Sequence, residues 1–281
     1  MGKTFFLNFL IMKINFLLNS IFALVIFCLN NLSAQNNQVE EGILDSNCEK
    51  IVEAPFHGTI FINPDIITPE DSTTFVNLLY SGREERIMFD RRVADWITIK
   101  PHLFPANYND SIQIEIQVNP EFGDHETSRY QAGKFAPIIG QLSKELRKDV
   151  KTVWIHKGDF PFGGGNNNLL IHTDYSAKNY EGQGILEETF IHEAAHTSLD
   201  AYHSNDELWI QAQQKDCVFI SDYAEDHPLR EDVAESFLPY LAIRYRPDRI
   251  PIELKNIIEK TMPNRIKYFD NQNFNMSLIE K

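Results

Sequence analysis

Residues 190–203 read FIHEAAHTSLDAYH and contain the residue types and spacing of a metal site. His192 and His196 are four residues apart, so on a helix their imidazoles lie on one face, about 40° apart and one turn along the axis. Glu193 lies about 100° around the helix from His192, where its carboxylate can reach a water at the metal but is a poor direct ligand. Its natural role is general base.

Zinc suits this HExxH pattern, because it binds imidazole and carboxylate, keeps an open position in catalytic sites and lowers the pKa of bound water to about 7. The pattern therefore predicts one zinc ion and a hydrolytic reaction. The alternative is a chance pattern whose histidines only cap or line a helix, so a third ligand is needed to separate the two interpretations.

His203 is a poor third ligand. On a continuing helix it would lie about 10 Å beyond His196, whereas zinc–nitrogen distances are about 2.0–2.1 Å, so we expect it at the surface or the rim of the cleft. Glu231 and Glu235 are better candidates, since they lie four apart on a helix expected to start after Pro228. One carboxylate can bind the metal while the other holds a histidine from behind, the alternative being a solvated acidic helix face.

HEAAH, followed 35 residues later by Glu231 within EDVAES, resembles the gluzincin branch of the zincin metallopeptidases. That branch includes thermolysin and the catalytic domain of anthrax lethal factor. The resemblance implies that His192, His196 and Glu231 bind zinc. It further implies that Glu193 is the general base and that Glu235 supports a histidine, although thermolysin has aspartate at that place. The substrate implied is a peptide or protein.

Three more residues are candidates for the same site. Tyr223, eight residues before Glu231, resembles the tyrosine with which lethal-factor-like members donate to the transition-state oxyanion, the alternative being aromatic packing. Asp200, four residues after His196, shares the metal face and can orient a ligand, or else it ends the helix. His172 belongs to LLIHT, the strand that in zincins precedes the active-site helix and edges the cleft, so the resemblance implies contact with substrate. A half-exposed strand histidine is the alternative.

The elements that must position these residues form an α+β pattern. Apolar residues alternate over residues 111–118, which is typical of a strand, and recur every four residues over 134–148, which is typical of a helix. Their order along the chain favours an α+β domain over a doubly wound sheet. The further elements expected are strands at 151–157 and 169–173 and helices from near Gly184, from Pro228 to Tyr245 and from near Pro251.

The resemblance implies that residues 106–281 form a zincin-like metallopeptidase domain, with a small twisted sheet, an active-site helix and a downstream glutamate helix. Residues 35–105 contain short β-type runs such as TIFI at 59–62 and predict a strand-rich N-terminal extension. GGGNNN at 163–168 lacks the Lys-Ser/Thr of a phosphate-binding loop, so we expect it to connect strands.

Residues 1–34 have the composition of a signal peptide. Lys3 and Lys13 are their only charges, and an apolar run is followed by LSAQ, so we expect cleavage near Ala34. The alternative is an uncleaved anchor, but the run is interrupted and a membrane span needs roughly 20 apolar residues. The prediction is a secreted or periplasmic protein with no stable membrane span after cleavage.

Composition limits the remaining possibilities. The chain has 281 residues, is 43% hydrophobic and carries a formal charge of −14, so it can bury a core and is a poor partner for nucleic acid. Cys48 and Cys217 can form one disulfide outside the cytoplasm or remain two free thiols. The number of subunits is not encoded in any of these patterns.

Taken together, the residues predict a secreted zinc metallopeptidase. A catalytically inactive binding or adhesion protein on the same scaffold is the alternative.

Overall fold

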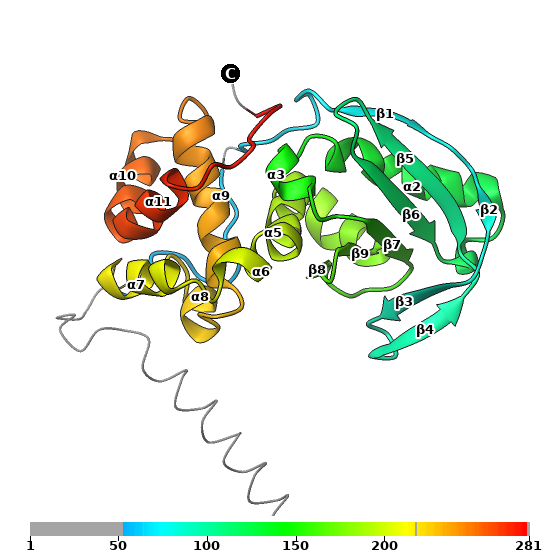
Figure 1. Cartoon of the computed structure of the whole chain (residues 1–281), viewed down its shortest axis with the longest axis horizontal. Coiled ribbons are helices and arrows are strands. Elements are labelled where there is room, and N and C mark those ends of the chain that lie inside the picture. The colour runs from blue at the N-terminus through cyan, green and yellow to red at the C-terminus, as the bar shows by residue number, and fades with distance from the viewer. Residues whose placement is uncertain (1–52, 64, 217, 280–281) are drawn as a thin grey trace, which may run out of the picture. The chain divides into compact units, whose positions relative to one another are not determined.

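The structure is a computed structural model that describes residues 53–63, 65–216 and 218–279 (Figure 1). In these ranges every helix is too short or too polar to cross a lipid bilayer. The signal peptide expected at the N-terminus and the pairing of Cys48 with Cys217 both lie outside the described residues.

The main sheet has seven strands of mixed direction, in the order β1-β5-β6-β7-β9-β8, with β2 also beside β5. Strands β1, β5 and β6 are antiparallel, β6, β7 and β9 are parallel, and β8 returns antiparallel to β9 at the edge. A separate hairpin consists of β3 and β4. The strands are β1 (Phe75–Leu78), β2 (Gly82–Arg83), β3 (Arg86–Asp90), β4 (Asp95–Ile99), β5 (His102–Tyr108), β6 (Gln113–Val118), β7 (Thr152–His156), β8 (Gly163–Gly165) and β9 (Asn168–His172).

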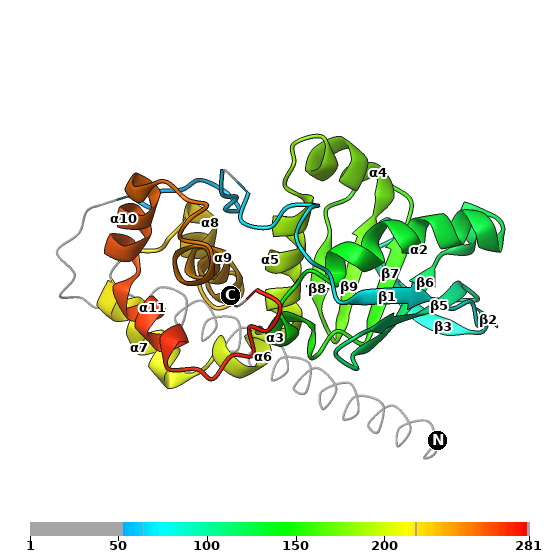
Figure 2. The ribbon, with the colours of Figure 1, turned by 90° about the horizontal axis from the view of Figure 1, so that it is seen from above.

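Helices occupy most of the remaining chain, and the predicted α+β class is confirmed. In Figures 1 and 2 the sheet lies on one side, α7 and α9 to α11 lie on the other, and α5 stands between them. The helices are α2 (His125–Ile139), α3 (Lys144–Arg147), α4 (Thr173–Tyr175), α5 (Leu186–Ser198), α6 (Asp200–His203), α7 (Glu207–Asp216), α8 (Asp222–Asp226), α9 (Asp232–Tyr245), α10 (Ile252–Thr261) and α11 (Pro263–Asp270), with a π-helical segment η2 (Ser176–Glu181) before α5.

Alternation along the central strands separates the two faces of the sheet. In β9, Leu169 and Ile171 join the large core that also contains buried residues of α2, α5 and α9. Leu170 points to the opposite face. There it packs with Trp154 of β7 and with Met88 of the β3–β4 hairpin. Because successive side chains of a strand point to opposite faces, both faces of the sheet are covered.

The helical side is held partly by a buried ion-pair network. The Arg265 guanidinium donates from Nε to Asp216 (3.0 Å) and from Nη1 to Asp232 (2.5 Å), and all three side chains are fully buried. Two carboxylates around one guanidinium satisfy its charge, which an apolar interior requires. Since Asp232 is the first residue of α9, the network fixes the start of that helix.

Residues 53–63 cross from the helical side to the sheet side, and we call them the crossing segment. The backbone N–H of Ile60 donates to Glu235 of α9 (3.1 Å), and that of Ile62 donates to Glu188 of α5 (2.7 Å). The expected strand at TIFI is therefore wrong, because its N–H groups bind buried carboxylates instead of a neighbouring strand. In Figures 1 and 2 this segment runs beside α9, and the chain after residue 64 continues past α5 to β1.

Two helix boundaries also differ from expectation. The helix expected at 134–148 is divided between α2 and the short α3. The Asp124 side chain caps the start of α2 by accepting from Thr127 N, and Gly140 caps its end. A Cβ at Gly140 would lie 2.8 Å from the backbone nitrogen of Phe75, so the chain before β1 packs directly on this glycine. The helix expected from Pro228 starts only at Asp232.

The boundary placed at residue 105 falls within β5, which pairs with β1 and β2 on one side and with β6 on the other. The strand-rich N-terminal extension therefore shares the main sheet.

Candidate metal centre

Helix α5 presents the two histidines of the HExxH pattern side by side. Phe190, Ile191 and Ala194 are fully buried and fix the helix in the core. The one-turn spacing leaves the Nε2 atoms of His192 and His196 3.1 Å apart.

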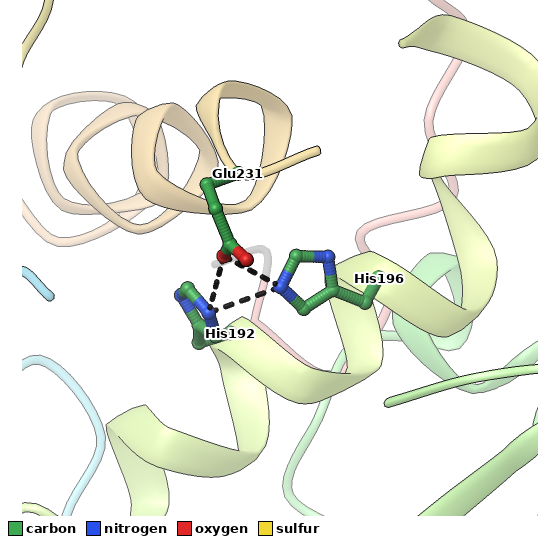
Figure 3. Close-up of side chains that lie close together, drawn as sticks. All are labelled: His192, His196 and Glu231. Atoms are coloured by element: carbon green, nitrogen blue, oxygen red, sulfur yellow. Dashed lines mark hydrogen bonds and ion pairs between the residues drawn. The ribbon is translucent and has the colours of Figure 1, made fainter. Parts of the chain in front are cut away.

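Glu231 brings the third ligand atom from a different element. It is the N-cap residue of α9 and is only 5% exposed. Its Oε2 lies 3.1 Å from His196 Nε2 and 3.5 Å from His192 Nε2 (Figure 3). The three residues form a group that could hold a metal ion.

The spacing of these atoms fits zinc. Ligands at about 2.0–2.1 Å from a tetrahedral zinc lie roughly 3.3 Å from one another. The three separations of 3.1, 3.1 and 3.5 Å scatter around that value. The site therefore has the size of a small divalent cation.

A further carboxylate stands behind each histidine. Asp200 Oδ2 lies 2.7 Å from His196 Nδ1 and, with α5 ending at Leu199, is carried by the first turn of α6. Glu235 Oε1 lies 3.4 Å from His192 Nδ1, which is an ion-pair distance rather than a close hydrogen bond. A carboxylate at Nδ1 favours the tautomer that carries its proton there and leaves Nε2 free to bind a metal.

The electrostatics of the group favour positive charge at the point where the three ligand atoms meet. Burial alone would lower the pKa of His196, but hydrogen bonds to Asp200 and Glu231 outweigh it and raise this pKa to about 10. Burial would raise the pKa of Glu231, but its bonds to His192 and His196 hold this pKa far below the usual range. A proton on the His196 imidazole supplies positive charge here, and a metal cation would supply it equally well.

A cavity of about 620 Å³ opens onto the three ligands. Glu193 and Tyr223 line it, so the structure brings both predicted catalytic residues to the ligand group. The Tyr223 hydroxyl donates to Glu231 Oε1 (3.0 Å), and Arg230 Nε donates to the same oxygen (2.7 Å). Burial, then the negative Glu231, raises the pKa of Tyr223, so this phenol stays a neutral donor at neutral pH.

Edge strand β8 also lines the cavity, through Gly164 and Gly165, and packs directly on α5. A Cβ added to Gly164 would lie 2.7 Å from the carbonyl carbon of Glu193 and 3.0 Å from His196 Cβ. Only glycine allows this approach of strand to helix. The GGG run, expected to connect strands, is therefore itself a strand, and it forms a wall of the cavity.

Two histidines lie in other surroundings than expected. His172 is fully buried, its Nδ1 lies 2.9 Å from Lys157 O, and it does not line the cavity. Its strand β9 lies between β7 and β8 and is not at the edge, so the expected edge position is wrong, while the substrate contact of His172 stays a prediction. His203 is not at the surface but buried, with Nδ1 2.8 Å from the Tyr268 hydroxyl.

Several lining residues escaped the sequence interpretation. Two of them had a signal in the sequence. Arg230 is the neighbour of Glu231, and the three successive glycines at 163–165 indicate a close approach of the backbone to another element. Arg91 and the crossing-segment residues Thr59 and Phe61 also line the cavity. They lie about 100 residues or more before the HExxH pattern, and the sequence offers no local signal for them.

Comparison of this chain with models of known families, with curated proteins and with solved structures, zincins included, finds no match.

Proposed function

We propose that this chain is a secreted or periplasmic zinc-dependent metallopeptidase of the gluzincin type. One observation carries the proposal. The ligand atoms of His192, His196 and Glu231 converge at zinc spacing on the wall of a cavity that Glu193 also lines. Among the described residues the group has three members and no fourth, which is the ligand number of catalytic rather than structural zinc.

Bound zinc would polarise the peptide carbonyl and lower the pKa of an attacking water. Glu193 acts as general base, taking the proton of that water, and then delivers it to the leaving amine. The carboxylate suits this role because it lines the cavity from the residue next to His192 and is not itself one of the three ligands.

Tyr223 stabilises the oxyanion that forms as the carbonyl is attacked. Its hydroxyl proton is held by Glu231 Oε1 in this structure, and a rotation of that O–H turns it towards the cavity. Arg230 continues to donate to Glu231 Oε1, so the carboxylate keeps one partner when the tyrosine leaves it. A neutral donor that turns to the oxyanion in this way contributes mainly in the transition state.

The test begins with metal content, because it requires no knowledge of the substrate. The protein from residue 35 onward should carry one zinc ion, and Glu231→Ala should bind it far more weakly. Glu225→Ala removes an exposed glutamate from the preceding helix and should leave zinc unchanged. A peptide library is then cleaved by the wild type, with Glu193→Gln as the variant that keeps zinc and loses turnover.

Two results would reject the proposal. Zinc binding that is indifferent to Glu231→Ala would place the metal elsewhere. Cleavage by Glu193→Gln at the wild-type rate would remove the general base from the mechanism. A zinc-loaded protein that cleaves nothing in the library would favour the alternative, a catalytically inactive binding or adhesion protein on the same scaffold.

A further inference from the structure

Arg91 differs from the other arginines of the described residues. Each of the others donates a side-chain hydrogen bond to a carboxylate or a backbone carbonyl. The Arg91 guanidinium has no such acceptor within the described part of the chain, although the residue is partly buried. A guanidinium has five N–H donors and always carries its charge, so a partly buried one without an acceptor is suited to an anion from outside.

The position of Arg91 is fixed by its neighbours. It follows β3 in the turn to β4, where Arg92 donates from its backbone N (2.9 Å) and its side chain to Asp90, and from Nη1 to Glu121 (2.6 Å). A Cβ added to Gly163 would lie 2.7 Å from Arg91 Nη2. The guanidinium therefore lies against edge strand β8, on a turn that Arg92 holds in place.

Arg91 lines two neighbouring cavities. One is the metal cavity, and the other is a hollow of about 330 Å³ that shares Gly164 and Gly165 with it. Aromatic side chains form much of the second hollow. Trp96 is 50% exposed and stands edge-to-face on Trp154, with ring centroids 5.4 Å apart. An apolar side chain can bury itself there, and aromatic walls favour a large one.

On the basis of the proposed peptidase activity, we propose that Arg91 binds a substrate carboxylate where the two cavities meet, beside a large apolar residue that enters the aromatic hollow. The substrates are then acidic-apolar peptides. Paired N–H groups of arginine match the two oxygens of a carboxylate, which gives direction as well as charge. The carboxylate is supplied by an aspartate or glutamate side chain or by a free C-terminus.

The test uses two libraries of peptides blocked at both ends, with either Glu or Gln fixed next to a randomised position. The wild type should cleave the Glu library with a kcat/KM about 10 to 100 times higher, the usual range for a hydrogen bond to a charged group. Arg91→Gln should bring the ratio close to one, and Arg91→Lys should retain part of it. Arg83→Gln removes the same charge from an exposed site and should keep the preference. Zinc content should be the same in all variants.

A third library, with a free C-terminus in place of the fixed acid, separates the two sources of the carboxylate. If kcat/KM depends on Arg91 only for this library, the site binds the C-terminal carboxylate. If it depends on Arg91 only for the Glu library, the site binds side-chain carboxylates. Cleavage with equal ratios in wild type and Arg91→Gln would overturn the inference and leave the peptidase proposal intact.

Binding separates failure of the inference from failure of the peptidase proposal. The Glu and Gln libraries are passed over two immobilised proteins, the Glu193→Gln variant and the double variant that also carries Arg91→Gln, and the retained peptides are quantified. Retention of the Glu library that requires Arg91 would support the carboxylate site even if the wild type cleaved nothing. Equal retention of both libraries would reject it.

Discussion

Replacing Gly164 by alanine tests the packing of β8 on α5 without any assumption about substrate. The added Cβ would lie 1.9 Å from the carbonyl oxygen of Glu193 and 2.7 Å from its carbonyl carbon, whereas carbon atoms in contact are about 3.5–4.0 Å apart. The strand and helix must therefore separate by at least about 1 Å. Overpacking of this kind costs about 1–3 kcal/mol, which corresponds to a fall in Tm of about 2–12 °C for a domain of this size.

The same displacement acts on the centre, because Glu193 and His196 belong to the helix that must move. A misplacement of about 1 Å can cost on the order of 100-fold in rate, so kcat should fall more than stability alone explains. Thermal unfolding and zinc affinity are measured together, with Gly182→Ala as the control. There the added Cβ would meet its nearest atom at 3.5 Å, and little change is expected. An unchanged Tm and zinc affinity in Gly164→Ala would refute the packing argument.

Three further predictions concern individual side chains. Asp200→Asn removes the carboxylate behind His196 and should weaken zinc binding by about 10 to 100-fold, measured in competition with a chelator. An unchanged affinity would mean that Asp200 does not influence His196 as a ligand. Tyr223→Phe should keep zinc, because Arg230 still donates to Glu231, and should lower kcat by about 100-fold. An unchanged kcat would mean that Tyr223 only packs against its neighbours. Burial lowers the pKa of His156 from 6.5 to about 4, so the unfolded chain binds this proton first as pH falls. The free energy of unfolding should then drop by up to about 3 kcal/mol between pH 6.5 and 4, less steeply in His156→Gln, and parallel pH profiles in urea unfolding would contradict this.

The part of the fold that was predictable from sequence is the part with local periodicity. Alternation over residues 111–118 and the apolar runs of β7 and β9 identified central strands, and the α+β class follows from them. The start of α2 was missed because its first buried apolar residue, Ala132, lies about two turns after the Asp124 cap. TIFI has the residue types of a strand, but its partners are Glu188 and Glu235, which tertiary contacts alone bring near.

The candidate centre divides in the same way. His192, Glu193 and His196 are adjacent on one helix, so their geometry follows from helix parameters alone. Glu231, 35 residues after His196, was inferred from the resemblance to the gluzincins, and the structure places it beside both histidines. Arg91 reaches the same cavity from a hairpin turn, and a single sequence does not show which turn will face a given helix.

The crossing segment also sets an order of events in the life of the chain. Its backbone binds Glu188 and Glu235, which follow Ile62 and Ile60 by 126 and 175 residues, so both contacts close very long loops. Contacts of such sequence separation form late, and none can form before the far partner has been synthesised. A nascent chain therefore contains the crossing segment and the HExxH pattern before it contains Glu231 or Glu235, and the contact of Ile60 with Glu235 can close only after both. On the proposed function, hydrolytic capacity would appear only after Glu231 has been synthesised, when most of the chain already exists.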